Sequence, residues 1–184
     1  MLVRIEDNVL PYIKKELSKT FGGTLDFTNK HALIVVGKRM DIFLVSNQIQ
    51  EIFKKSKIKP NLFFAGQFIG FIMKRKFFPS LSVIHKLSKS AKKKISINDK
   101  AAELFIYKRD IFSNSILSIS QTTKKGDIVI VTNKEDEPLG YGKINESSLI
   151  IKELGSKPVV ENILDIGDYL RREDNPHSFY GEED

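Results

Sequence analysis

Four short stretches rich in β-branched and apolar residues follow one another closely in the second half of the chain. They cover residues 116–120, 127–132, 138–144 and 148–153. The turns at 124–127 and 134–137 are short and polar, so no helix fits between these stretches and neighbouring strands must pair directly. This spacing predicts a small β-barrel closed on itself. The predicted unit is completed by a strand at 95–98, a helix at 99–107, an extended segment from 159 and a helix at 165–172.

The first half of the chain mixes helical and extended patterns. The predicted helices cover 6–20, 46–55 and 80–91, and the predicted strands cover 24–28, 31–36, 41–46 and 62–73. Gly22 and Gly23 end the first helix because glycine tolerates positive φ, and Ser46 or Asn47 caps the second. We expect Ile49, Ile52 and Phe53 to face inward from the second helix. The whole chain is therefore predicted to be α+β, with an N-terminal antiparallel sheet and flanking helices before the C-terminal barrel.

The change of pattern near 90–94 places a domain boundary there. We predict an N-terminal domain at 1–91, a C-terminal domain at 92–172 and a tail at 173–184. The last 12 residues carry five acidic side chains and no apolar periodicity, so the tail is expected to be disordered.

Basic residues are concentrated in the N-terminal half. The chain carries a net charge of +7, and the 47 residues from 52 to 98 hold 12 Lys or Arg and no Asp or Glu. We therefore expect no local salt bridge to neutralise them. A field of one sign raises the local concentration of phosphate groups and speeds their association. We therefore expect a polyanionic partner, and RNA, DNA and an anionic membrane surface all fit this charge.

The residue patterns that accompany catalysis are missing from the sequence. There is no cysteine, and His31, His85 and His177 lie far apart without metal-ligand spacing. Neither a GxSxG nucleophile elbow nor a GxxxxGK[ST] phosphate loop occurs. The longest nearly apolar run, 62–73, has 12 residues and is too short to span a bilayer. We expect no catalytic residue, metal, cofactor or small-molecule substrate, no membrane partner, and an intracellular location.

The segment 124–132, followed by an acidic turn and Pro138-Leu139-Gly140-Tyr141-Gly142, resembles the core of a PUA domain, an RNA-binding pseudo-barrel. Gly140 and Gly142 lie on one face of the predicted strand, where a missing side chain lets another backbone approach closely.

Other motifs occur in the order found in one family that carries this domain. They are Phe64–Gly70 with Lys74–Phe78, Leu104–Tyr107, Pro138–Gly142 and Asp165–Glu173. In these features the chain resembles the Nip-seven family of large-subunit ribosome-biogenesis factors. The resemblance implies a pre-PUA domain before the PUA domain, and a non-catalytic RNA-binding role in pre-rRNA processing. It also implies pre-ribosomal particles and processing proteins as partners. The location would be cytoplasmic in an archaeon, and nucleolar or nuclear in a eukaryote.

The resemblance further implies that RNA runs over the first PUA helix, the loop after it, and the C-terminal strand and helix. That surface would present Lys100, Lys108, Arg109, Ser113, Asn114, Ser115, Lys157, Arg171 and Arg172. Three consecutive basic residues of the acid-free segment are further candidates for RNA contact: Lys74, Arg75 and Lys76. Reversing Arg171 and Arg172 to Glu is expected to weaken RNA binding more than reversing Lys54 and Lys55.

The aromatic residues divide into two groups. Phe43, Phe53, Phe105 and Phe112 occupy apolar-periodic positions and are expected in the core. Phe77 and Phe78 follow the basic run and are candidates for contact with RNA or protein.

Two alternative functions remain open at this point. PUA modules are often fused to pseudouridine synthases or transglycosylases, so the chain could be an RNA-modification enzyme or its accessory subunit. In the other alternative, the acidic tail and apolar surface recruit processing proteins.

Overall fold

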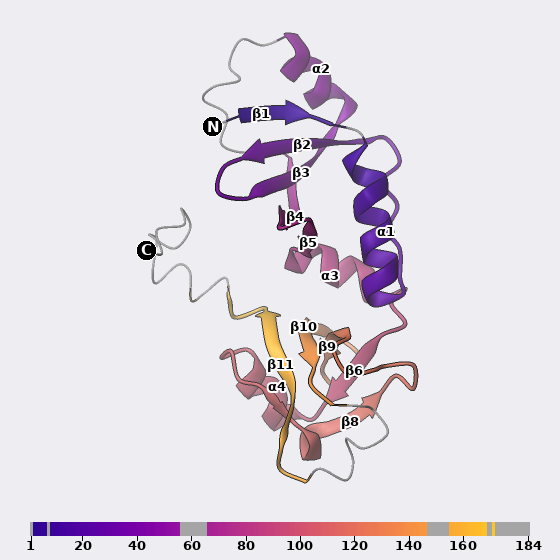
Figure 1. Ribbon diagram of the computed structural model, residues 1–184, viewed down its shortest axis with the longest axis vertical. Coiled ribbons are helices and arrows are strands. Elements are labelled where there is room, and N and C mark those ends of the chain that lie inside the picture. The colour runs from indigo at the N-terminus through magenta and orange to yellow at the C-terminus, as the bar shows by residue number, and fades with distance from the viewer. Residues whose placement is uncertain (1, 7, 56–65, 147–154, 169–170, 172–184) are drawn as a thin grey trace. The chain divides into compact units, whose positions relative to one another are not determined.

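The computed structural model describes residues 2–6, 8–55, 66–146, 155–168 and 171. They form two compact units, which are described separately. The N-terminal unit comprises Met1–Lys19 and Thr24–Val83, and the C-terminal unit comprises Thr20–Gly23 and Ile84–Asp184 (Figure 1).

The N-terminal unit is built on a five-stranded sheet in which every neighbouring pair is antiparallel. Its strands, in spatial order, are β1 (Leu2–Ile5), β2 (Lys30–Val36), β3 (Met40–Ser46), β4 (Gln67–Met73) and β5 (Lys76–Pro79). The predicted antiparallel sheet is confirmed, but the predicted strand at 24–28 is wrong. The Asp26 carboxylate instead accepts hydrogen bonds from the Thr28 amide at 3.0 Å and from its hydroxyl at 2.6 Å. Residues 24–28 therefore form a local turn instead of a strand, and the strand that pairs with β2 on that side is β1.

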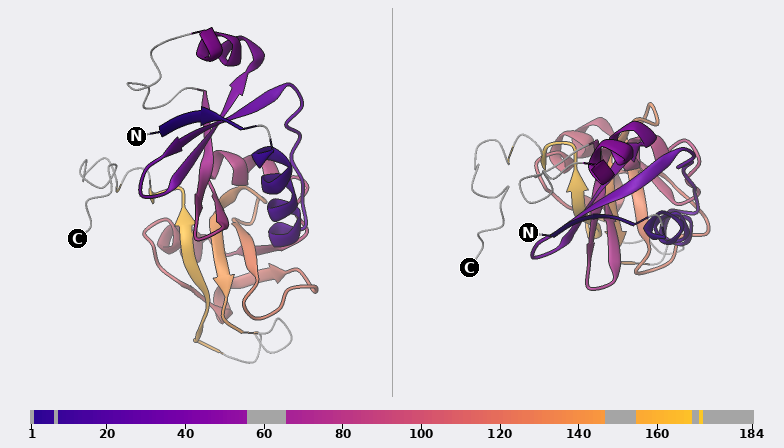
Figure 2. Two further views of the ribbon diagram at one scale, coloured as in Figure 1. Left: turned by 45° about the horizontal axis from the view of Figure 1, so that its top comes forward. Right: turned by 90° about the horizontal axis from the view of Figure 1, so that it is seen from above.

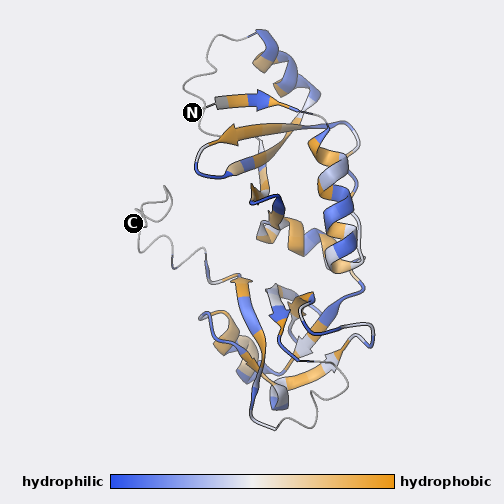
Figure 3. Cartoon of the chain, viewed as in Figure 1, coloured by the Kyte–Doolittle hydropathy of each residue, from blue (hydrophilic) through white to orange (hydrophobic). Residues whose placement is uncertain are grey.

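Helices α1 (Val9–Phe21) and α2 (Asn47–Lys55) lie largely in this unit, and α3 (Leu81–Leu87) spans the boundary between the two units. One face of α1 is apolar and buried, whereas the opposite face carries lysines, as the two colours along this helix show (Figure 3). Gly22, at φ +71°, ends α1 as predicted. Ile49 and Phe53 of α2 pack against Leu33 and its buried neighbours, as expected. Ile52 is 66% exposed, so its predicted inward position is wrong.

The C-terminal unit is a six-stranded, barrel-like sheet, as the strand spacing predicts. Its strands are β6 (Lys94–Ile97), β7 (Ile111–Phe112), β8 (Ile116–Ile119), β9 (Ile128–Thr132), β10 (Pro138–Ile144) and β11 (Pro158–Asp165). The spatial order is β7-β11-β10-β9-β6-β8, and only the β6–β9 pairing is parallel. The views in Figure 2 show β9, β10 and β11 side by side in orange and yellow. The predicted strand at 148–153 lies outside the described residues.

Helix α4 (Asp99–Phe105) closes one side of the C-terminal core. The side chain of Asn98 caps it by accepting a hydrogen bond from the Ala101 amide at 2.9 Å. Phe105 is fully buried among residues from β6, β7, β9, β10 and β11. A short 3-10 turn at Ser113–Ser115 follows β7. Residues of α4 and of β11 therefore pack into the same core, which holds the two elements in place. The predicted RNA surface depends on both elements.

The two glycines of β10 have the role that the sequence predicts. Gly140 has φ +155°, and a Cβ atom there would collide with the Leu164 carbonyl oxygen of β11. At Gly142 a Cβ atom would lie 2.6 Å from the Glu161 carbonyl oxygen. Because both positions lack a side chain, the backbones of β10 and β11 can approach closely enough to pair.

Candidate nucleic-acid interface

Part of the acid-free segment is neutralised by residues from elsewhere in the sequence. Lys93 pairs with Asp127 at 2.9 Å and Lys94 with Asp136 at 2.8 Å, while Lys54 and Lys55 lie within 4 Å of one carboxylate, Glu51. The expectation that no salt bridge neutralises the lysines of this segment is therefore wrong for at least these four. The acids that pair with Lys93 and Lys94 lie in distant turns of the barrel, so the local sequence does not reveal them, whereas Glu51 lies just before the segment.

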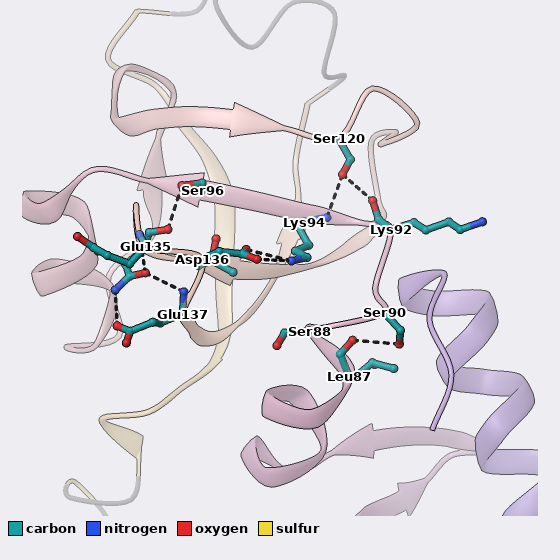
Figure 4. Close-up of polar contacts among 12 residues, drawn as sticks. Leu87, Ser88, Ser90, Lys92, Lys94, Ser96, Ser120, Glu135, Asp136 and Glu137 are labelled. Atoms are coloured by element: carbon teal, nitrogen blue, oxygen red, sulfur yellow. Dashed lines mark hydrogen bonds and ion pairs between the residues drawn. The ribbon is translucent and has the colours of Figure 1, made fainter. Parts of the chain in front are cut away.

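The start of β6 is held by a group of polar contacts rather than being open to a ligand (Figure 4). The Ser120 hydroxyl donates to the Lys92 carbonyl at 2.6 Å and accepts from the Lys94 amide at 3.1 Å. Burial raises the pKa of the Asp127 carboxyl, but hydrogen bonds from the Lys124 amide and Lys93 outweigh it and hold that pKa below its ordinary value. Lys93 and Lys94 thus tie the start of β6 to the turns that precede and follow β9.

A second group of cations lies where α4 ends. Lys108 and Arg109 are exposed just beyond the helix, and Lys100 is exposed at its start. The Lys108 ammonium donates to the Ile163 carbonyl of β11 at 2.5 Å. A carbonyl does not cancel a positive charge, so Lys108 keeps its charge at a fixed position beside β11. Of these three residues, Lys108 is the one whose side chain contacts β11 in the part of the chain that the structure describes.

The loop at Ser113–Ser115 is fixed more firmly than a free phosphate-binding loop would be. The Ser113 hydroxyl is buried and donates to the Gly155 carbonyl, and the Ser113 amide donates to the Lys157 carbonyl at 3.0 Å. Asn114 is exposed, and Ser115 is half-buried, with its carbonyl accepting from Asn98 at 3.0 Å. The hydroxyl of Ser113 is committed to the loop. Asn114 is exposed, although its Nδ2 donates to the Ser156 hydroxyl at 3.5 Å, and Lys157 is exposed as well.

Arg171 has a partner inside the fold. Its Nη2 atom donates to both oxygens of Asp165, at 2.9 and 2.8 Å, and its Nη1 atom donates to the Ile106 carbonyl. Asp165 is fully buried and also accepts from the Gly167 amide at 2.8 Å and from Asn162 Nδ2 at 3.1 Å. Arg171 therefore ties the segment after β11 to the end of α4.

This geometry corrects the predicted closing helix. Asp165 is the last residue of β11 rather than the first of a helix, and helical backbone is described at 168 and 171. Asp165 does accept from the Gly167 amide, as a capping carboxylate would. The sequence spacing shows that local contact but not the buried pairing with Arg171. Arg172 lies outside the described residues.

Exposed cations lie near both ends of β11, and the exposed acid Glu161 lies within the strand. Lys157 directly precedes the strand and Asp165 ends it, a separation of about 27 Å at about 3.4 Å per residue in an extended strand. Lys108 lies toward the far end, where it contacts Ile163, and Arg109 is the next residue in the sequence. Charges distributed over this length match an extended polyanion better than a compact ligand.

Sequence reasoning missed one residue of this surface. Tyr107 is 70% exposed and immediately precedes Lys108 and Arg109, because α4 ends at Phe105 and the chain turns outward. An aromatic ring beside cations is the arrangement that holds stacked bases of single-stranded nucleic acid. The sequence signal was available: two aromatic residues separated by one position cannot both face the same side of a helix.

The phenylalanines differ partly from expectation. Phe43 and Phe53 pack against the N-terminal core and Phe105 is fully buried. Phe112 is 43% exposed, so its predicted core position is wrong; it lies on β7, the two-residue edge strand of its sheet. Phe78 is half-buried and stacks on Phe71 with ring centroids 5.0 Å apart.

The described residues contain no group of three or more His, Asp or Glu side chains that could hold a metal ion. His31 Nε2 lies 3.0 Å from Asn47 Oδ1, and its Nδ1 lies 2.9 Å from Gln50 Nε2. These contacts assign the proton to Nε2, because Gln50 Nε2 can only donate. Among the described helices, none is long and apolar enough to cross a membrane.

Comparison with solved structures shows the same fold in two archaeal proteins. A conserved PUA domain protein from Thermoplasma acidophilum superimposes with a TM-score of 0.69 at 14% identity, over 93% of this chain and 98% of that one. A hypothetical protein from Pyrococcus horikoshii gives 0.65 at 16% identity, over 92% and 97%.

Comparison of sequences identifies the family. Residues 4–81 match the NIP7/UPF0113 pre-PUA domain, and residues 93–174 match the UPF0113 PUA domain. A UPF0113 protein of Archaeoglobus fulgidus is 33% identical over 92% of this chain and 94% of its own length. A 60S ribosome subunit biogenesis protein NIP7 homolog of Xenopus laevis is 25% identical over 72% of this chain and 74% of its own length. The resemblance in the sequence motifs is confirmed: the chain belongs to the NIP7/UPF0113 family, with its pre-PUA and PUA domains.

Proposed function

We propose that this protein is a non-catalytic RNA-binding factor that acts in pre-rRNA processing and assembly of the large ribosomal subunit. The observation that carries the proposal is the row of exposed cations beside β11, with Tyr107 at one end. Relatives named as 60S ribosome subunit biogenesis proteins support the cellular role. Pre-ribosomal particles and their processing proteins are then the partners. The protein acts where ribosomes are assembled, in the cytoplasm of an archaeon or the nucleolus of a eukaryote.

We further propose that the chain consists of two domains and a tail. Residues 92–172 would form the PUA RNA-binding domain, residues 1–91 the pre-PUA domain, and residues 173–184 an acidic tail. The matches at 93–174 and 4–81 support the first two assignments.

In this proposal the cations hold the phosphate chain without reading its sequence. Arg109 and Lys157 contact phosphate oxygens, Lys108 adds charge from a fixed position, and Tyr107 stacks on one base. Asn114 offers an exposed amide to the same strand. Arg171 and Ser113 act as positioning residues, because their polar groups are already bonded within the fold.

Replacing Arg109 and Lys157 together by Gln is expected to weaken binding to single-stranded pre-rRNA segments by about 25-fold at 0.1 M salt. Each phosphate contact contributes about 0.7 to the slope of log K against log[salt] for single strands, or about fivefold at this concentration. The slope should therefore fall in magnitude by about 1.4. Fluorescence anisotropy with labelled RNA at several salt concentrations measures both quantities.

The matched control replaces Lys125 and Lys134 by Gln. Both lie in the same unit but already pair with acids, at 3.6 Å to Glu146 and 2.6 Å to Asp99. The control should keep its affinity within about twofold. Tyr107→Ala should lower affinity by about 1–3 kcal/mol without changing the slope, because stacking releases no counterion. Equal losses in R109Q/K157Q and the control would contradict a localised site.

The non-catalytic part of the proposal has a separate test. Pre-rRNA incubated with the pure protein should show no new modified base when digested and analysed by mass spectrometry. A modified nucleoside would favour the RNA-modification alternative.

A further inference from the structure

The hairpin that joins β4 and β5 has an unusual two-residue turn. Met73 pairs with Lys76, so Lys74 and Arg75 alone form the turn. Both have positive φ, +49° and +60°, which is the pattern of a type I′ turn. Such turns favour Asn-Gly, because a larger side chain is strained in the left-handed region. A basic residue occupies each strained position.

The strained turn is held in place by its surroundings. The Tyr12 hydroxyl of α1 donates to the Arg75 carbonyl at 2.8 Å. Along the hairpin, Phe71 and Phe78 stack at 5.0 Å with their rings 11° apart, and the Arg39 guanidinium lies 4.2 Å from the centre of the Phe71 ring. The tip of the hairpin is therefore held by contacts with α1 and by packing between aromatic side chains of β4 and β5.

The charge of the tip is not cancelled locally. Lys74, Arg75 and Lys76 are all exposed, and no acidic side chain among the described residues forms an ion pair with any of them. This distinguishes the tip from Lys54, Lys55, Lys93 and Lys94 of the acid-free segment, which all have acidic partners.

Strain that persists in a well-supported turn points to a role for the side chains that cause it. We propose that the β4–β5 tip is a second RNA contact, which grips backbone phosphates through Lys74, Arg75 and Lys76 independently of the PUA surface. The inference rests on the proposed RNA-binding function and adds to it a site in the other unit. Three adjacent cations on a narrow ribbon match a run of phosphates, each of which offers oxygen acceptors to an ammonium or guanidinium group.

The turn itself allows a test that separates folding from binding. The variant K74N/R75G installs the residues that a type I′ turn prefers and removes two charges. It should unfold at a temperature a few degrees higher than the parent, because the strain at two positions is relieved. It should bind single-stranded RNA about 25-fold more weakly at 0.1 M salt, with the slope of log K against log[salt] reduced in magnitude by about 1.4.

K54Q/K55Q is the matched control, since it removes two charges from the same unit at positions that already face Glu51. It should change the affinity less than threefold. Unchanged RNA affinity in K74N/R75G, or equal losses in the two variants, would overturn the inference. If R109Q/K157Q weakens RNA binding while K74N/R75G does not, only the hairpin site fails. If the parent protein binds no RNA, the proposed function itself fails.

Discussion

Replacement of Arg171 by Met is expected to lower the free energy of unfolding of the C-terminal unit by about 3–5 kcal/mol, the cost of leaving a buried charge without its partner. Asp165 is 0% exposed, and Arg171 Nη2 reaches both of its oxygens within 2.9 Å. The Ile106 carbonyl would lose its donor in the same variant. Urea denaturation followed by circular dichroism measures the loss.

Asp165→Asn is the informative companion variant. The Asn side chain keeps an oxygen for the Gly167 amide, and the Arg171 side chain, 34% exposed, can turn toward water. The loss should be about 1.5–3 kcal/mol, which is the scale of one hydrogen bond to a charged group. Equal stability of the parent and R171M would contradict the structural role of Arg171. So would a loss of RNA affinity in R171M with the unfolding free energy unchanged.

This result changes how charge reversal at the C-terminus is interpreted. Arg171→Glu would place a second carboxylate against buried Asp165, so the expected loss of RNA binding would follow from unfolding. Binding data from that variant are informative only alongside a stability measurement. Arg109 and Lys157 are the better tests of phosphate contact, because their charged groups face solvent.

Replacement of Gly140 by Ala is expected to destabilise the barrel by about 2–6 kcal/mol. The added Cβ would collide with the Leu164 carbonyl and lie 2.8 Å from the Asp165 Cα, so β10 and β11 would have to separate. Overpacking contributes about 1–3 kcal/mol and the φ of +155° a similar amount. At about 4–8 °C per kcal/mol for a unit of this size, the Tm should fall by at least about 8 °C.

Gly155→Ala is the control for the backbone contribution. Gly155 has φ +59°, and a Cβ atom there would meet nothing within 4 Å, so only the cost of the left-handed conformation applies. That cost is about 1–2 kcal/mol. A G140A variant no less stable than G155A would show that the close approach of β10 and β11 is not required.

The parts of the fold that could be predicted from the sequence depend on local chemistry. Strand β10 was recognisable because Pro138, Gly140 and Gly142 each require a particular backbone environment. The strand predicted at 24–28 failed because Asp26 and Thr28 form a local hydrogen-bonded turn that competes with β structure. Strand β1 was not predicted, because it has only four residues and its partner β2 follows α1 in the sequence.

The candidate site was predictable in its charge but not in its connections. Arg109 and Lys157, which the family resemblance implies as surface residues, are both exposed. Arg171 carries the same charge, yet its role is set by Asp165 and by the Ile106 carbonyl, 65 positions earlier in the sequence. Burial of an acidic residue that pairs with a distant arginine has no signature in local periodicity, and only the closed barrel brings these groups together.

The salt dependence of RNA binding tests the central claim most directly, because phosphate contacts release counterions and other contacts do not. With about five phosphates neutralised, log K for a single-stranded pre-rRNA segment should fall against log[salt] with a slope near −3.5. A slope near zero, at any affinity, would contradict an account in which the exposed lysines and arginines hold the RNA backbone.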